Sequence, residues 1–195
     1  MLTLRKLTLA AGAAAALSSG AAPAAEPYPS KPLRVVVSYP PGGVTDIIAR
    51  TVAQRLNEAW GQPVIVENRS GVSGNLGAQY AAKATPDGYT IFVSTSSHSI
   101  GASLYRNLNY DLLRDFAGVS LLATTPSVLV VNNAVPVKDV RDFIAYAKAI
   151  PGKLSFGSAG MGSAPHLAVE LFGYMTGTSF LHIPYKGNLG TLSDL

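Results

Sequence analysis

The sequence contains no cysteine, which excludes disulfide bonds, thiol catalysis and cysteine-ligated metals. Charge is sparse as well, because only 13% of the residues are charged and no run of lysine or arginine occurs. A nucleic-acid-binding protein needs such a basic stripe, so nucleic acid is not an expected partner. Beyond residue 25, no apolar stretch is long enough to cross a membrane.

The N-terminus has the order of parts that a secretory signal requires. Arg5 and Lys6 precede an apolar run at 7–17, and a small-residue segment with an A-x-A site at 22–24 follows. This order predicts a signal peptide at residues 1–24, cleaved on export, and therefore a periplasmic protein. A buried N-terminal helix is the alternative, but it does not require the three parts in this order.

Short apolar runs and helical periodicities alternate along the rest of the chain. Strands are predicted at 33–38, 64–66, 89–94, 154–156 and 180–183, and helices at 44–60, 71–84, 138–150, 164–176 and after 187. Short connections between them favour parallel, doubly wound sheets, and hence an α/β fold. Two further apolar segments, 116–123 and 128–131, are also strand-like.

Two glycine-rich loops share one design, in which a strand leads into a turn and the turn into a helix N-terminus. They lie at 40–45 and 158–163. Glycine allows close approach to a ligand, and the N–H groups of a helix N-terminus suit a carboxylate. Loops at the carboxyl ends of parallel strands commonly form ligand sites. Either loop alone is equally typical of a tight turn, but the repeated design favours a ligand site between them.

Enzyme and metal motifs are poorly matched. Residues 160–165 lack the last glycine of the dinucleotide pattern, and residues 71–75 lack the fifth position of G-x-S-x-G. His98, His166 and His182 have no local ligand pattern around them, so neither a metal nor a cofactor is expected. A secreted hydrolase using Ser163 or Ser158 with His166 is an alternative, although no acid is evident behind the histidine.

The sequence resembles the Bug-type periplasmic substrate-binding proteins of tripartite tricarboxylate transporter systems. The segments that carry the resemblance occur in the family's order at 28–32, 40–46, 67–71, 86–89, 157–167 and 182–187. The resemblance implies a type II periplasmic-binding-protein fold, in which two α/β lobes close on a small carboxylate without catalysis. It also implies delivery to a membrane permease, or, as in some relatives, presentation of the ligand to a signalling partner.

Two features depart from the family. Residues 188–191 replace the usual Ser/Ala-Pro-Ala stretch, which puts ligand specificity on that side in doubt. Family members also run to roughly twice a single-domain length, so the chain is interpreted as C-terminally truncated, with an incomplete second lobe. The expected organisation is a first lobe at 25–124, lacking its returning C-terminal part, and a partial second lobe at 125–195.

The predicted ligand site combines both loops. Its members are Tyr39, Gly43, Val44, Thr45, Asp46, Ser158, Ala159, Gly162, Ser163 and His166. Backbone N–H groups are expected to hold the carboxylate of the ligand, which is an organic acid, a dicarboxylate or an amino-acid-like molecule. The protein is expected to be a monomer. Asp46 has two open interpretations, because it could complement the helix dipole or select a ligand with an ammonium or hydroxyl group.

Overall fold

The computed structural model describes residues 27–195, so the predicted signal peptide at 1–24 lies outside the described residues. Residues 31–195 form one compact unit that contains two separate sheets. The predicted lobe boundary between residues 124 and 125 stays a prediction. Within residues 27–195, no helix is both long and apolar enough to span a bilayer.

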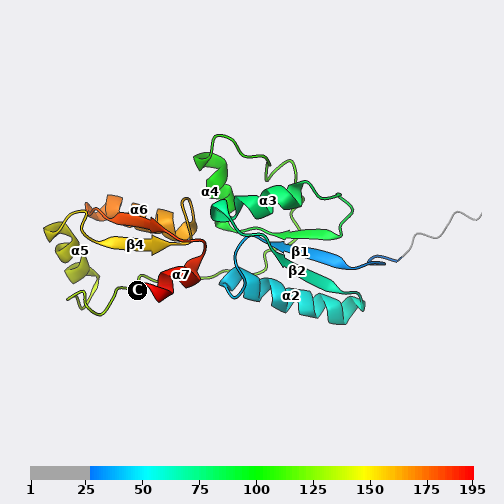
Figure 1. Ribbon diagram of the computed structural model, residues 1–195, viewed down its shortest axis with the longest axis horizontal. Coiled ribbons are helices and arrows are strands. Elements are labelled where there is room, and N and C mark those ends of the chain that lie inside the picture. Colours follow the sequence, from blue (N-terminus) through cyan, green and yellow to red (C-terminus); the bar gives the residue numbers. More distant parts are fainter. Residues whose placement is uncertain (1–26) are drawn as a thin grey trace, which may run out of the picture. The chain divides into compact units, whose positions relative to one another are not determined.

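The first sheet has three parallel strands in the order β2-β1-β3. Their bounds are β1 Leu33–Val37, β2 Val64–Asn68 and β3 Thr90–Val93. Helix α2 (Val44–Trp60) and the shorter α3 (Asn75–Ala82) cover opposite faces of this sheet (Figure 1). Because a helix follows each of the first two strands, the predicted β-α-β-α-β unit is confirmed.

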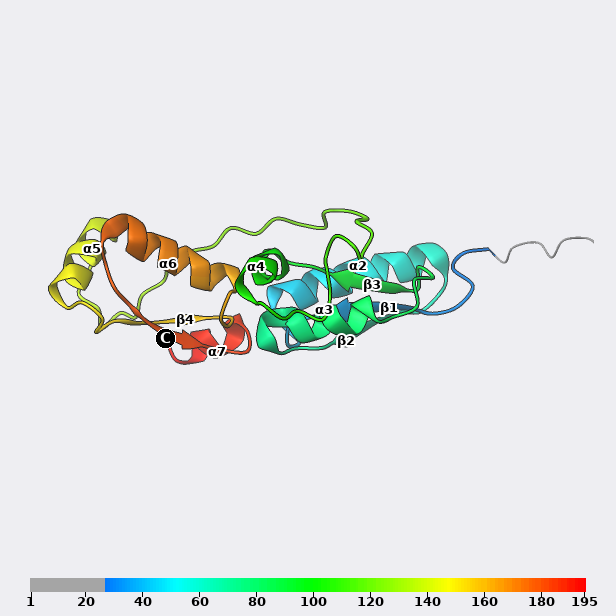
Figure 2. The ribbon, with the colours of Figure 1, turned by 90° about the horizontal axis from the view of Figure 1, so that it is seen from above.

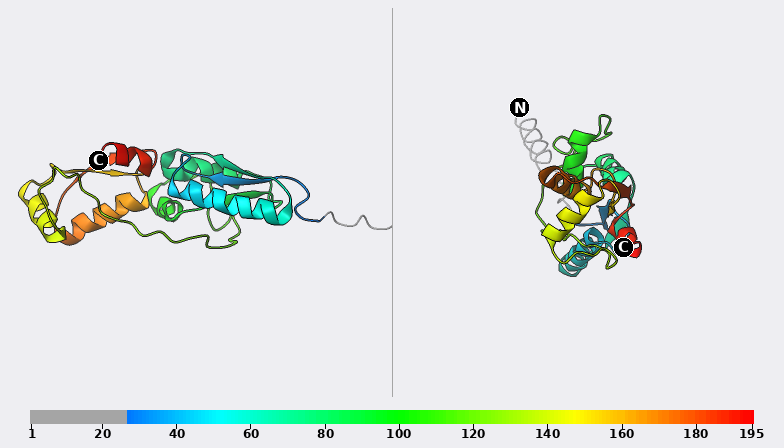
Figure 3. Two further views of the ribbon diagram at one scale, coloured as in Figure 1. Left: turned by 90° about the horizontal axis from the view of Figure 1, so that it is seen from below. Right: turned by 90° about the vertical axis from the view of Figure 1, so that its left-hand side faces the viewer.

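The central strand β1 is apolar because both of its faces are covered. Leu33, Val36 and Val37 are at most 1% exposed. Val35 and Val37 pack with Ala49 of α2 and Val93 of β3 to form the core of this sheet. The view from below shows α2 running along the sheet (Figure 3).

The second sheet pairs β4 (Ser155–Ser158) with β5 (Leu181–Pro184) in parallel. Three helices accompany it: α5 (Val140–Ala149), α6 (Ala164–Thr176) and α7 (Asn188–Ser193) (Figure 2). Aromatic rings join its layers, because Phe143 of α5 lies 5.8 Å from Phe180 and 6.0 Å from Phe172, between ring centroids. The parallel α/β prediction is therefore confirmed for this sheet too.

Glycines end the two longest helices where the sequence predicted. Helix α2 ends at Gly61 and α6 at Gly177, both of which have positive φ. A residue without Cβ adopts this left-handed conformation at little cost, and its N–H then bonds a carbonyl of the last turn. Both predicted spans, 44–60 and 164–176, match the observed helices.

Two predictions in the middle of the chain were wrong, and one helix was not predicted. The single helix at 71–84 is a short 3₁₀ turn, η1 (Val72–Gly74), followed by α3, because the backbone at 72–73 is left-handed. Helix α4 (Ser96–Leu104) was not predicted, since its small and polar residues lack a clear apolar period. The strand-like segments at 116–123 and 128–131 form no strand.

The last of these errors has a physical reason. A strand needs a partner, and in residues 27–195 neither segment pairs with β2 or β3, the outer strands of the first sheet. Figure 2 shows this part of the chain running from α4 to α5 without a strand or helix. Its apolar side chains are exposed, with Val119 at 91%, Leu121 at 79% and Val128 at 80%.

Candidate functional site

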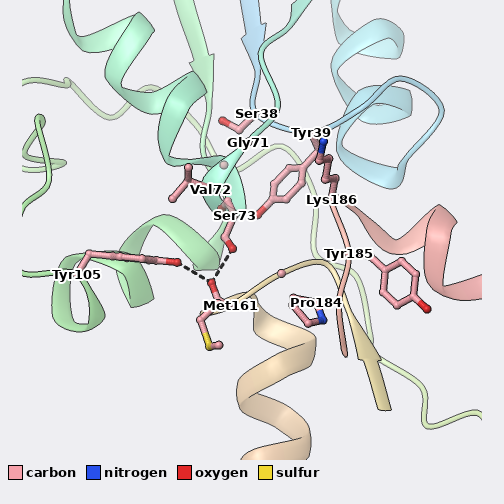
Figure 4. Close-up of a pocket in the computed structure, with 12 residues that line it drawn as sticks. Ser38, Tyr39, Gly71, Val72, Ser73, Tyr105, Met161, Pro184, Tyr185 and Lys186 are labelled. Carbon is pink, nitrogen blue, oxygen red and sulfur yellow. Dashed lines mark hydrogen bonds between the residues drawn. The ribbon is translucent and has the colours of Figure 1, made fainter. Parts of the chain in front are cut away.

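A cavity of about 320 Å³ lies where the carboxyl ends of strands from both sheets meet (Figure 4). The lining residues come from the ends of β1 and β5, the turn before α3, the end of α4 and the second glycine-rich loop. They are Ser38, Tyr39, Gly71, Val72, Ser73, Gly74, Tyr105, Gly160, Met161, Pro184, Tyr185 and Lys186. This is the position expected for a ligand site in parallel α/β folds.

The electrostatic character of the cavity is simple. Lys186 is the only charged residue among those that line it, and no carboxylate faces it. Gly74 lies both in the cavity wall and at the N-cap of α3, so the N-terminal N–H groups of that helix add partial positive charge nearby. The cavity therefore favours an anionic ligand.

The first glycine-rich loop, at 40–45, does not line this cavity, although the residue before it does. Tyr39 lines the cavity, whereas Gly43, Val44, Thr45 and Asp46 do not. Gly43 has an ordinary φ of −75°, and a Cβ there would meet only the Pro40 carbonyl oxygen, at 3.7 Å. The structure thus brings one of the five predicted residues of this half to the cavity.

Asp46 is 2% exposed and holds the first loop in shape. Its carboxylate accepts hydrogen bonds from the Gly42 N–H at 2.9 Å, from Arg50 Nε at 2.9 Å and from Asn68 Nδ2 at 2.8 Å. Burial alone would raise the pKa of Asp46, but the hydrogen bonds from Arg50, Gly42 and Asn68 hold it below its usual value. These contacts favour a structural role over ligand selection.

Asp46→Asn should therefore destabilise the protein without changing which carboxylate it binds. We expect the free energy of unfolding to fall by about 1–2 kcal/mol, because charge-assisted hydrogen bonds are lost beside a half-exposed Arg50. Urea denaturation measures this change. The control is Asp142→Asn in the first turn of α5, an exposed carboxylate that should cost only about 0.3–1 kcal/mol. Unchanged stability together with an altered ligand profile would contradict the structural role.

The second loop presents its apex to the cavity and buries its flanks. Gly160 and Met161 line the cavity, while Ser158, Ala159, Gly162 and Ser163 are buried beside it. Ser163 caps α6 by accepting the His166 N–H, and Ser158 Oγ accepts the Gly160 N–H at 3.1 Å. The predicted residues of this loop thus shape the apex rather than line the cavity.

Two neighbouring imidazoles, tilted by 31° to each other, support the same loop. The rings of His166 and His182 lie 4.1 Å apart, between centroids. Gly162 N–H donates to His166 Nδ1 at 3.2 Å, and Ser158 Oγ lies 2.7 Å from His182 Nε2. Burial, with a smaller contribution from neighbouring His166, lowers the pKa of His182. The His182 imidazole, whose pKa is lowered, is therefore part of the loop's support.

The hydrolase alternative finds little support in this geometry. His166 Nδ1 is occupied by the Gly162 N–H, and Ser163 Oγ accepts the His166 backbone N–H. Ser158, whose hydroxyl does contact an imidazole, is only 1% exposed. No group of three or more histidine, aspartate or glutamate side chains in residues 27–195 is placed to hold a metal ion.

His98 is fully buried beneath the cavity and connects three segments. Its Nδ1 accepts the Thr95 N–H at 2.9 Å, so Nε2 carries the proton toward Ser38 Oγ at 3.2 Å and the Gly74 carbonyl at 3.4 Å. Both Ser38 and Gly74 line the cavity. Burial lowers the pKa of His98, and the nearby carbonyl oxygens of Thr95 and Gly74, which favour the protonated ring, only partly offset this effect.

The lowered histidine pKa predicts a loss of stability in mild acid. The pKa of His98 is about 6.5 in the unfolded chain and lower in the folded protein, so between these two values only the unfolded chain binds the proton. The free energy of unfolding is therefore highest above about pH 6.5 and falls as the pH drops below it. The slope should approach about 1.4 kcal/mol per pH unit for each such proton. Urea denaturation at pH 7.5, 6.5 and 5.5 measures it, and His98→Asn, which keeps an acceptor for Thr95, should flatten it. Equal slopes in both proteins would contradict this account.

Sequence reasoning missed most of the lining residues. It treated 71–74 as the start of a helix and gave no site role to Tyr105 or 184–186. One available signal was that 184–186 follow a predicted strand, since parallel strands end at the same edge of a sheet. The conformation of 71–74 had no comparable signal.

Comparison with known proteins identifies the family. Residues 48–195 match the family model described as tripartite tricarboxylate transporter family receptor, TctC. Protein BugT of Bordetella pertussis is 39% identical over 197 aligned residues, which cover 100% of this chain and 60% of BugT. The chain belongs to this family of receptors, and it spans about 60% of the length of that relative.

Solved structures agree with this membership. A structure of R. palustris Rpa4515 with adipate has a TM-score of 0.81 and 42% identity, covering 86% of this chain and 56% of that one. MatC from Rhodopseudomonas palustris with bound malate has a TM-score of 0.79 and 31% identity, covering 86% and 57%. The neighbours have the periplasmic binding-protein fold of the TctC type, so that predicted fold is confirmed, with only part of the second lobe covered.

Proposed function

We propose that this chain is a periplasmic solute-binding protein that holds a small dicarboxylate in the 320 Å³ cavity and hands it to a membrane permease. No catalytic step is part of this function. The observation that carries the proposal is the charge of the cavity, whose lining combines neutral residues with the single cation Lys186. Desolvating a carboxylate in such a site is compensated by N–H donors and one ammonium group.

The size of the cavity supports the same ligand class. A volume of about 320 Å³ is at the small end of the range of roughly 300–1,000 Å³ that is typical of ligand pockets. Relatives solved with adipate and with malate carry ligands of this class. We place the carboxylate beside the Gly160–Met161 apex and Lys186, rather than against the N–H groups of Gly43, Val44 and Thr45.

The location of the protein is part of the proposal. The charged, apolar and small-residue parts of residues 1–24 support export and cleavage. Membership of a tripartite transporter receptor family supports a permease as the partner. Closure around the dicarboxylate would give the permease a surface that differs between the loaded and the empty protein.

Calorimetry tests the ligand class. The protein is titrated with adipate, malate and other mono- and dicarboxylates, and with the uncharged diamide of adipic acid as the matched control. We expect at least one dicarboxylate to bind and the diamide not to bind. Equal binding of acid and diamide, or no heat with any carboxylate, would refute the proposal.

A further inference from the structure

The turn before α3 has a backbone conformation that is unfavourable for two of its residues. Four consecutive residues have positive φ: Gly71 at 140°, Val72 at 47°, Ser73 at 53° and Gly74 at 95°. The two glycines adopt such angles readily, but a left-handed serine is uncommon and a left-handed β-branched valine is a clear outlier. All four residues line the cavity. Strain that persists in a binding-site wall is commonly retained for a function.

The strained turn aims one hydroxyl across the cavity. Ser73 Oγ donates a hydrogen bond to the Met161 carbonyl oxygen at 2.6 Å, over a sequence separation of 88 residues. The Tyr105 hydroxyl, from the end of α4, donates to the same oxygen at 2.9 Å. Figure 4 shows both bonds converging on this atom. Met161 lies at the apex of the second loop. Its carbonyl oxygen therefore accepts hydrogen bonds from two segments across the cavity, the turn before α3 and the end of α4.

The turn itself is supported from below. The Tyr39 hydroxyl donates to the Ser73 carbonyl oxygen at 3.2 Å, and a Cβ on Gly160 would lie 2.6 Å from Ser73 Oγ. The serine hydroxyl therefore occupies space that only a glycine at 160 leaves open. A glycine at position 73 would fit the backbone better but would have no hydroxyl to donate.

We propose that Ser73 and Tyr105 form a latch that holds the Gly160–Met161 apex over the cavity and so slows release of the bound dicarboxylate. The part that concerns release rests on the proposed function. Neither residue needs to touch the ligand, since both act by positioning the apex. The strain at Ser73 is kept because that conformation directs Oγ to the Met161 carbonyl.

The latch can be tested without any ligand. Because the chain lacks cysteine, Ala59→Cys on α2 and Ala145→Cys on α5 introduce two unique, exposed sites for nitroxide labels. Pulsed electron paramagnetic resonance then measures the distribution of distances between the labels. We expect Ser73→Gly, Ser73→Ala and Tyr105→Phe each to broaden this distribution, and Ser73→Gly with Tyr105→Phe to broaden it most. A double variant with the parent distribution would overturn the latch.

The ligand arm uses adipate and separates the latch from simple flexibility. Ser73→Gly should increase the adipate dissociation rate about tenfold, because it removes the hydrogen bond from Ser73 to the Met161 carbonyl oxygen. Tyr110→Phe is the matched control, since Tyr110 does not line the cavity and donates its hydroxyl to Asn75, the residue after the turn, so that its loss removes no hydrogen bond to Met161. Equal acceleration in Ser73→Gly and Tyr110→Phe would assign the effect to a more flexible turn and overturn the latch.

The two proposals fail in different ways. If the unaltered protein binds no carboxylate, the proposed function fails and the label distances alone decide on the latch. If adipate binds but Ser73→Ala and Tyr105→Phe release it at the parent rate, the latch fails and the proposed function stands.

Discussion

Gly160→Val should abolish adipate binding. Gly160 lies in the cavity wall with φ of +124°, a conformation that L-residues rarely adopt. A Cβ there would meet Ser73 Oγ at 2.6 Å and the Tyr185 carbonyl oxygen at 3.2 Å. The backbone oxygen cannot rotate away as a side chain can, so the loop apex has to move. Valine would also fill space that the ligand needs, and calorimetry should detect no binding.

Strain alone would also destabilise the protein, so a control is needed. Gly152→Val puts the same residue at a positive φ of 69° in a turn where a Cβ meets nothing within 4 Å. Both variants should lose roughly 1–2 kcal/mol of stability from the left-handed backbone. Gly152→Val should keep the affinity of the parent protein for adipate. If Gly160→Val also keeps it, the cavity is not the binding site.

Lys186→Glu should likewise eliminate binding, because it replaces the only cation of the cavity wall with an anion. The ligand carboxylate would lose an attractive charge and face a repulsive one inside a site that lacks other cations. Lys186→Gln, which removes the charge without reversing it, should weaken binding about tenfold, because Lys186 is exposed to solvent. Calorimetry with adipate and malate measures both effects.

The matched control for this change is Lys153→Glu. Lys153 is an exposed lysine in the turn after α5 and does not line the cavity, so the net charge changes equally. Affinity should then stay at the parent value. If Lys153→Glu weakens binding as much as Lys186→Glu does, the effect belongs to the overall charge of the protein and not to the cavity.

The regular parts of the fold were predictable from local chemistry. In helix α2, apolar residues recur every three to four positions and so form one face, and a glycine follows the last turn. Both bounds of the helix could therefore be predicted. Strand β1 is apolar except at the exposed Arg34, because it is the central strand of a covered sheet. Segment 116–131 has the same apolar character but forms no strand, because pairing depends on a partner edge that a local pattern does not reveal.

The candidate site was predictable in position but not in detail. Parallel strands and glycine-rich loops indicated the edge of the sheets at which the cavity lies, and Tyr39, one of the predicted residues, lines that cavity. Val72 and Ser73 were predicted as part of an alanine-rich helix, because tertiary contacts such as the Ser73–Met161 hydrogen bond cannot be recognised in the local sequence. Asp46 was equally ambiguous until its three hydrogen-bond donors were known.

The central claim is that a dicarboxylate binds in the cavity between the 71–74 turn, the Gly160–Met161 apex and Lys186. Nitrogen-15 chemical-shift mapping during an adipate titration tests it most directly, because each backbone N–H reports on its own surroundings. The account predicts that the largest saturable shifts occur at 71–74, 158–163 and 185–187. Shifts confined to Gly43, Val44 and Thr45, or to the separate cavity formed by α6 and residues 178–180, would contradict it.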